Sequence, residues 1–134
     1  DVYKRQVLLV SNKYEKFLKN PNFFNVAEEE IQEITKSAKL TKNSLAKLNT
    51  NSQNLFISHY LNKKASKICS EAVLYLNNDS NYNNKAILIF GSTNKKIFNE
   101  TNKTDYLNVL AKVISIQFNN LMDYKNERKT QNNF

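Results

Sequence analysis

Two apolar runs separated by a polar turn constrain this chain more than any other feature. Residues 86–90, Ala-Ile-Leu-Ile-Phe, are apolar on both faces, which predicts a central strand covered on each side. The segment 77–84 before them consists almost entirely of Asn, Asp and Ser, as is typical of a turn. The sequence therefore predicts a β-hairpin over 69–92. In its first strand, residues 69–76, one face carries Ser70, Ala72, Leu74 and Leu76, and the other carries Glu71, Val73 and Tyr75.

The last third of the chain has the strongest helical periodicity. Asn102 is a candidate N-cap, with Asp105 three residues later. We expect a helix over 103–125, followed by a frayed polar tail over 126–134. Its apolar stripe either packs only on the sheet or, broadened by Ile116, also buries a partner helix. The stripe recurs at spacings of three and four and comprises Tyr106, Leu107, Leu110, Val113, Ile114, Phe118 and Leu121.

The first half of the chain gives weaker signals. Residues 7–10 predict a buried strand, and residues 11–24 a loop with one helical turn near 14–19. A helix is expected over 26–36, with Asn25 as its N-cap and Glu28 as the capping-box partner. Its apolar face comprises Val26, Ile31, Ile34 and Ala38.

The middle of the chain predicts a short strand over 44–48, although a helix starting at Lys42 is the competing interpretation. Ser52 can cap a helix that carries Leu55, Phe56, His59 and Tyr60, and a second short helix extends to about residue 67. The whole order is strand, helix, strand, helix, strand, strand, long helix. This order predicts an α+β fold with helices packed on an antiparallel sheet.

Composition limits the classes of function. The chain has 134 residues, which fits one domain, and it contains one Gly, one Pro and one Cys. Its formal net charge is +8, but the cations are nearly all Lys, spread along the chain, with only Arg5 and Arg128 as arginines. Arginine is the residue that recognises bases and phosphates with two hydrogen bonds. We therefore interpret the charge as a solvated surface and expect no nucleic-acid partner.

The chain ends and the redox chemistry give three further expectations. Residues 1–6 resemble a translated adapter, so we expect a non-native leader there and an N-terminally truncated domain over 7–125. Cys69 is alone and cannot form a disulfide within the chain, which suits a reducing, cytoplasmic compartment. No apolar run approaches the ~20 residues of a membrane span.

The hairpin and the last helix resemble a GAF domain. The similar bacterial family has GAF-like domains of unknown function and is often encoded beside a tyrosine recombinase. The matching residues are 70–76, 87–92, Phe98 and 104–107, although Lys103 stands where that family has Gly. The resemblance covers 65–121 well and 7–64 loosely. It implies a GAF-like antiparallel sheet, a role in small-molecule sensing or signalling, and a missing N-terminal helical region. Independently, Gly91 is expected to allow either a positive φ or a close backbone approach, and Phe98 is expected to anchor its loop to the core.

No catalytic, cofactor or metal constellation is visible in the sequence. Nucleophilic catalysis would depend on His59 and Cys69, and no oxyanion loop accompanies them. We expect His59 to be a partly buried packing residue and Cys69 a small buried hydrophobe. The acidic residues 28–30 and Glu33 are weak candidates for binding a hard cation, but complementation of the helix dipole and solvation explain them better. Glu71 and Asp105 are expected to be exposed or capping.

The sequence therefore predicts a non-enzymatic, GAF-like sensory or regulatory module. It would bind a small molecule between sheet and helices and form a homodimer through its C-terminal helix. A purely structural dimerisation domain without a ligand is the first alternative. A basic nucleic-acid accessory domain is the second.

Overall fold

The computed structural model describes residues 4–11, 23–50, 53–61, 68–77, 85–94 and 102–131. The predictions for the loop at 12–22, the Ser52 cap, the short helix near 62–67, the turn at 78–84 and Phe98 lie outside these residues. The elements in chain order are β1 (Lys4–Ser11), β2 (Phe23–Val26), α1 (Glu28–Ser37), β3 (Ala46–Asn49), the 3-10 helix η2 (Phe56–His59), β4 (Ser70–Asn77), β5 (Lys85–Ser92) and α2 (Asn102–Gln131).

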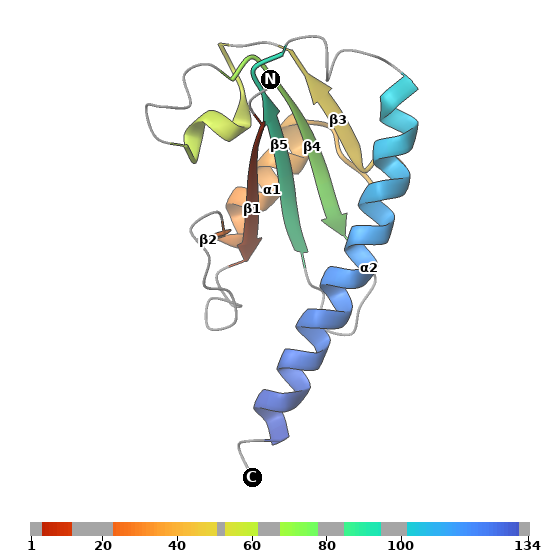
Figure 1. Ribbon diagram of the computed structural model, residues 1–134. Coiled ribbons are helices and arrows are strands. Elements are labelled where there is room, and N and C mark those ends of the chain that lie inside the picture. Colours follow the sequence, from red (N-terminus) through yellow and green to blue (C-terminus); the bar gives the residue numbers. More distant parts are fainter. Residues whose placement is uncertain are drawn as a thin grey trace.

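Five strands form one mixed sheet in the order β2-β1-β5-β4-β3 (Figure 1). The predicted hairpin is confirmed, because β4 pairs antiparallel with β5 over their whole length, from Ser70 opposite Ser92 to Asn77 opposite Lys85. β5 is the central strand, as expected, and also pairs antiparallel with β1. The pair β1–β2 is parallel and was not predicted.

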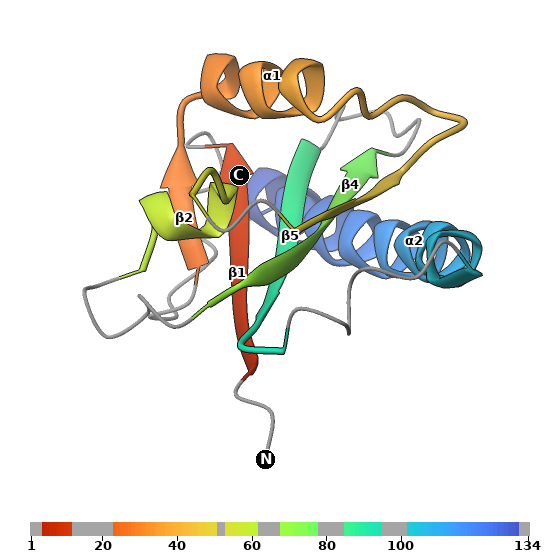
Figure 2. The ribbon, with the colours of Figure 1, turned by 90° about the horizontal axis from the view of Figure 1, so that it is seen from above.

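The two faces of the sheet are covered by different elements. In Figure 1, α1 lies behind the sheet and α2 lies in front of it, and Figure 2 shows them on opposite sides of the strands. The face toward α1 and η2 carries Val73 and Ile89, both fully buried. The face toward α2 carries Leu74 and Leu88, both buried. The fold is thus α+β, with a mostly antiparallel sheet and a long C-terminal helix packed on it, as the sequence predicts.

α1 begins later than predicted and has a different cap. Asn25 lies in β2 opposite Val10, so parallel pairing with β1 keeps it extended. Ala27 occupies the N-cap position without a side-chain hydrogen bond, and Glu28 is the first helical residue instead of the third. The predicted apolar face is confirmed, because Val26, Ile31, Ile34 and Ala38 are all buried.

Several other elements begin or end a few residues away from the positions that the sequence predicts. β3 starts at Ala46, which supports the strand over a helix from Lys42. The predicted helix after Ser52 is a single 3-10 turn, Phe56–His59. α2 continues to Gln131, so the segment 126–131, where fraying was expected, is helical. β1 starts at Lys4, so Lys4, Arg5 and Gln6 pair with β5 although they were assigned to a leader.

Candidate functional site

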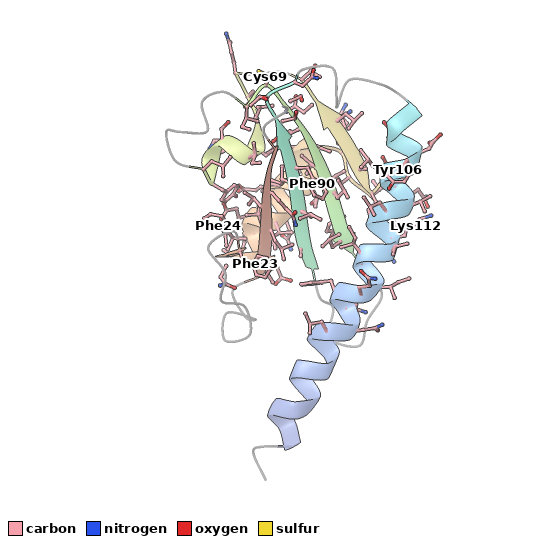
Figure 3. The ribbon with its side chains drawn as sticks, in the orientation of Figure 1. Phe23, Phe24, Cys69, Phe90, Tyr106 and Lys112 are labelled. Carbon is pink, nitrogen blue, oxygen red and sulfur yellow. The ribbon has the colours of Figure 1, made fainter. Side chains whose placement is uncertain are left out.

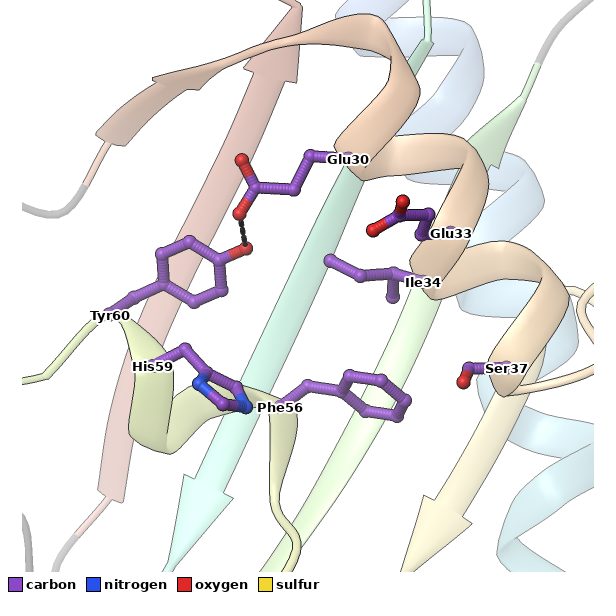
Figure 4. A pocket seen from close by; sticks show the side chains of 7 residues that line it. All are labelled: Glu30, Glu33, Ile34, Ser37, Phe56, His59 and Tyr60. Carbon is purple, nitrogen blue, oxygen red and sulfur yellow. Dashed lines mark hydrogen bonds between the residues drawn. The ribbon is translucent and has the colours of Figure 1, made fainter.

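A pocket of about 320 Å³ lies between α1 and η2, on the face of the sheet away from α2 (Figure 4). A second, smaller pocket of about 210 Å³ lies beside it toward β3 and shares Ser37 and Phe56 with it. Together they form one groove, which we call the α1–η2 groove. The larger pocket is lined by Glu30, Glu33, Ile34, Ser37, Phe56, His59 and Tyr60.

The two walls of the groove are joined by one strong hydrogen bond. Tyr60, the residue after η2, donates its hydroxyl proton to the Glu30 carboxylate of α1 (Figure 4). Burial and the neighbouring Glu30 raise the pKa of Tyr60, so the phenol stays protonated. The Tyr60 ring also packs against Phe24 of β2, with ring centroids 5.6 Å apart. These contacts fix the width of one end of the pocket.

The position of η2 depends on a buried carboxylate. Glu71 of β4 is fully buried and accepts hydrogen bonds from the backbone N–H groups of Phe56 (2.8 Å) and Ile57 (2.9 Å). The Asn49 side chain of β3 donates a third bond at 2.9 Å. Glu71 therefore caps the start of η2 from the sheet, supplying the acceptor that the Leu55 N-cap position lacks. The prediction of an exposed Glu71 was wrong, whereas its capping role is confirmed.

Gly91 allows η2 to lie directly on the sheet. It stands opposite Glu71 in the hairpin. A Cβ atom at Gly91 would lie 2.9 Å from Ile57 Cδ1 and 3.0 Å from Ile68 Cγ2. The expected close approach is thus confirmed, and the neighbour is the side chain of the η2 residue Ile57, which is fully buried.

The other residues singled out from the sequence do not converge. His59 is exposed and lines the groove, so the prediction of a partly buried packing residue was wrong. Cys69 is half-buried just before β4, at one end of the sheet (Figure 3), and does not line the groove. Asp105 is exposed in the first turn of α2. Within the described ranges, no three His, Cys, Asp or Glu side chains are arranged to hold a metal ion.

The apolar stripe of α2 is broad, as the sequence predicts, and its two sides have different surroundings, with the half-buried Leu110 and Ile114 between them. One face packs on the sheet and includes Leu107, Ala111 and Phe118, all buried. The opposite face exposes large apolar side chains, and Figure 3 shows Tyr106 directed away from the sheet. We call this face the α2 stripe; it comprises Tyr106, Val109, Val113 and Ile116, between 47% and 67% exposed.

Comparison with protein-family models, with curated proteins and with solved structures finds no match to this chain. In the part of the chain that the structure describes, no helix is both long enough and apolar enough to cross a membrane.

The buried Glu71 gives a prediction for the pH dependence of stability. Burial raises its pKa above the ordinary value of 4.5, outweighing the hydrogen bonds from Ile57, Phe56 and Asn49 and the attraction of His59. The folded chain therefore keeps a proton on Glu71 at pH values where the unfolded chain has released it. Its contribution to stability is largest below the unfolded pKa and declines as the pH rises toward the folded pKa.

The measurement is the free energy of unfolding in urea across this pH interval. We expect the difference between the wild type and Glu71→Gln to decrease steadily as the pH rises above 4.5. The glutamine cannot titrate, so it isolates the effect of this one carboxyl group. A difference that stays constant, or grows with pH, would contradict the raised pKa.

Proposed function

We propose that this chain is a non-enzymatic sensory or regulatory domain that binds a small molecule in the α1–η2 groove. The observation that carries the proposal is the pocket of about 320 Å³ between two elements that cover the same face of the sheet. This volume lies at the lower end of the range for small-molecule sites. Its lining combines the apolar Ile34 and Phe56 with several polar side chains, as such sites require.

The architecture of the groove supports this proposal over a filled structural core. The groove is held open by the Glu30–Tyr60 bond at one end and by the anchoring of η2 on Glu71 below. A role in small-molecule sensing is also what the GAF-like resemblance of residues 65–121 implies. A domain that only dimerises has no need of such a groove.

Filling the groove tests the proposal. Ser37 is exposed and lines both pockets, so Ser37→Trp should occupy the groove without disturbing the core. The matched control is Ser58→Trp, because Ser58 is exposed on η2 and does not line the groove. Native mass spectrometry should show a retained small molecule on the wild type and on Ser58→Trp, and at least about tenfold less on Ser37→Trp. Equal retention by both variants would place the ligand elsewhere.

Dimerisation is the second candidate function, and the α2 stripe favours it. Its residues follow spacings of three, four and three, which is the pattern of a helix-pairing seam. The stripe faces away from the sheet, so pairing with a second copy of α2 would bury it without changing the fold. We propose a homodimer formed through this face, with or without a ligand in the groove.

A charge in the middle of the α2 stripe should separate the subunits. Val113→Lys places an ammonium group in the seam, where burial without a partner is unfavourable. We expect the wild type to be a dimer in sedimentation equilibrium and Val113→Lys to weaken association by at least about tenfold. Gln32→Lys, on the exposed surface of α1, is the matched control and should remain dimeric. Unchanged association of Val113→Lys would exclude the α2 stripe as the interface.

A further inference from the structure

The larger pocket of the α1–η2 groove carries a charge opposite to that of the whole chain. The formal net charge of the protein is +8. Among the described residues, the lining of the larger pocket nevertheless has two carboxylates, from Glu30 and Glu33, and neither Lys nor Arg, whereas Lys47 lines the smaller pocket. The described residues thus make this pocket a locally acidic site on a basic protein, which attracts cations and repels anions.

The two carboxylates form one wall of the pocket. Glu30 and Glu33 are three residues apart on α1, so they lie on the same side of the helix (Figure 4). Glu30 is half-buried and held by the Tyr60 hydroxyl, whereas Glu33 is exposed at the rim. The helix dipole accounts for acidic residues in the first turn, Glu28 to Glu30, but it weakens beyond that turn, where Glu33 lies.

The opposite wall is aromatic. Phe56 and His59 of η2 face α1 across the pocket, and Ile34 lies between the walls (Figure 4). Carboxylates on one side and the Phe56 ring on the other are the two kinds of surface that an alkylammonium group prefers, through ion pairing and cation–π attraction. Ile34 and Phe56 supply contacts for an apolar part of the same molecule.

The spacing of the acidic groups disfavours a bare metal ion. Glu30, Glu33 and His59 all line the pocket, yet among the described residues no three such side chains are arranged around a common metal position. A ligand that is larger than an ion can contact both carboxylates and the aromatic wall together.

We propose that the α1–η2 groove binds a small organic cation, namely an amine that carries an apolar or aromatic group. The ammonium group lies beside Glu30 and Glu33, and the apolar group packs against Phe56 and Ile34. This inference rests on the proposed function, since it names the ligand class of the same pocket.

Three probes that share a phenyl ring and differ in charge test the inference. Phenethylamine is the cation, 2-phenylethanol the neutral analogue and phenylacetate the anion. Titration followed by amide NMR of the intact chain at about 20 mM salt should give phenethylamine an affinity at least about tenfold above that of 2-phenylethanol, with phenylacetate weakest. At about 300 mM salt the advantage of the amine should shrink, because added ions screen the carboxylates.

Two variants that each remove one carboxylate from α1 test whether the preference for the cation comes from Glu33. Glu33→Gln keeps the size of an exposed side chain, so the fold should be unchanged. It should weaken phenethylamine binding by about three- to tenfold and leave 2-phenylethanol unaffected. Glu29→Gln removes the same charge from an exposed position of α1 outside the pocket lining and should leave both affinities unchanged.

The outcomes separate this inference from the proposed function. If phenylacetate or 2-phenylethanol binds as tightly as phenethylamine and shifts the amides of α1 and η2, the groove binds ligands but the cation inference is wrong. Equal losses of phenethylamine affinity in Glu33→Gln and Glu29→Gln also overturn it. If no probe shifts these amides and native mass spectrometry finds no retained molecule, both proposals fail.

Discussion

Replacing Glu71 with alanine is expected to lower the free energy of unfolding by about 3 to 5 kcal/mol, because two buried backbone donors lose their acceptor. These donors are the N–H groups of Phe56 and Ile57, at 2.8 and 2.9 Å from the carboxylate. Water cannot replace the carboxylate easily, since Glu71 is fully buried. The loss is a large fraction of the ~5 to 15 kcal/mol that stabilises a domain, and the melting temperature should fall by about 10 °C or more.

Two measurements and two further variants define the role of Glu71. Urea unfolding gives the free energy, and hydrogen exchange of the Phe56 and Ile57 amides reports whether η2 detaches locally before global unfolding. Glu71→Gln keeps one acceptor oxygen and should be intermediate. Glu29→Ala, an exposed glutamate on α1, should change stability by no more than about 0.5 kcal/mol. If Glu71→Ala were as stable as Glu29→Ala, the carboxylate would not be what holds η2.

Any side chain at position 91 is expected to lower the free energy of unfolding, and a larger one to lower it more. Gly91→Ala places a Cβ 2.9 Å from Ile57 Cδ1, which can move only by displacing other core atoms because Ile57 is fully buried. We expect a loss of about 1 kcal/mol for alanine and about 3 kcal/mol for valine, as for other overpacked cores. The measurement is again the free energy of unfolding in urea.

A double-mutant cycle identifies the clashing atom. Ile57→Val removes Cδ1 and should cost about 1 kcal/mol alone. Combined with Gly91→Ala, it should recover most of the alanine penalty, giving a favourable interaction energy of about 1 kcal/mol. Ile87→Val is the control, because Ile87 lies four residues away along β5, on the order of 13 Å. Additivity of Gly91→Ala with Ile57→Val would show that the clash is elsewhere.

The sequence predicts the centre of this fold better than its edge. The hairpin of β4 and β5 follows from two apolar runs around a polar turn, and both are long enough to show a pattern. β2 has only four residues, Phe23–Val26, and owes its extended form to parallel pairing with β1. That pairing joins segments whose local patterns are too short to reveal it. Because of it, α1 starts at Glu28 and not at Val26, where the sequence predicts the start.

The candidate site was harder to predict than the fold. The groove requires α1 and η2 to lie together, and these are far apart in the sequence. One signal was available, because the alternation in β4 places Glu71 on the same face as Val73 and Tyr75. A carboxylate on an apolar strand face indicates a buried and fully bonded group. His59 was misassigned because an expected amphipathic helix is a single 3-10 turn with an exposed end.

Because side chains alternate between the two faces along β4, the residues that contact η2 and α2 are neighbours in the chain. Glu71 supports η2, one wall of the groove, while the next residue, Ala72, is fully buried on the face that α2 covers. The residue that holds η2 and the residue that faces α2 are therefore adjacent in β4, with Cα atoms about 3.8 Å apart. A displacement of η2 that moved the β4 backbone at Glu71 would also move Ala72 and the surface on which α2 packs. β4 thus connects one wall of the groove with the helix that carries the α2 stripe.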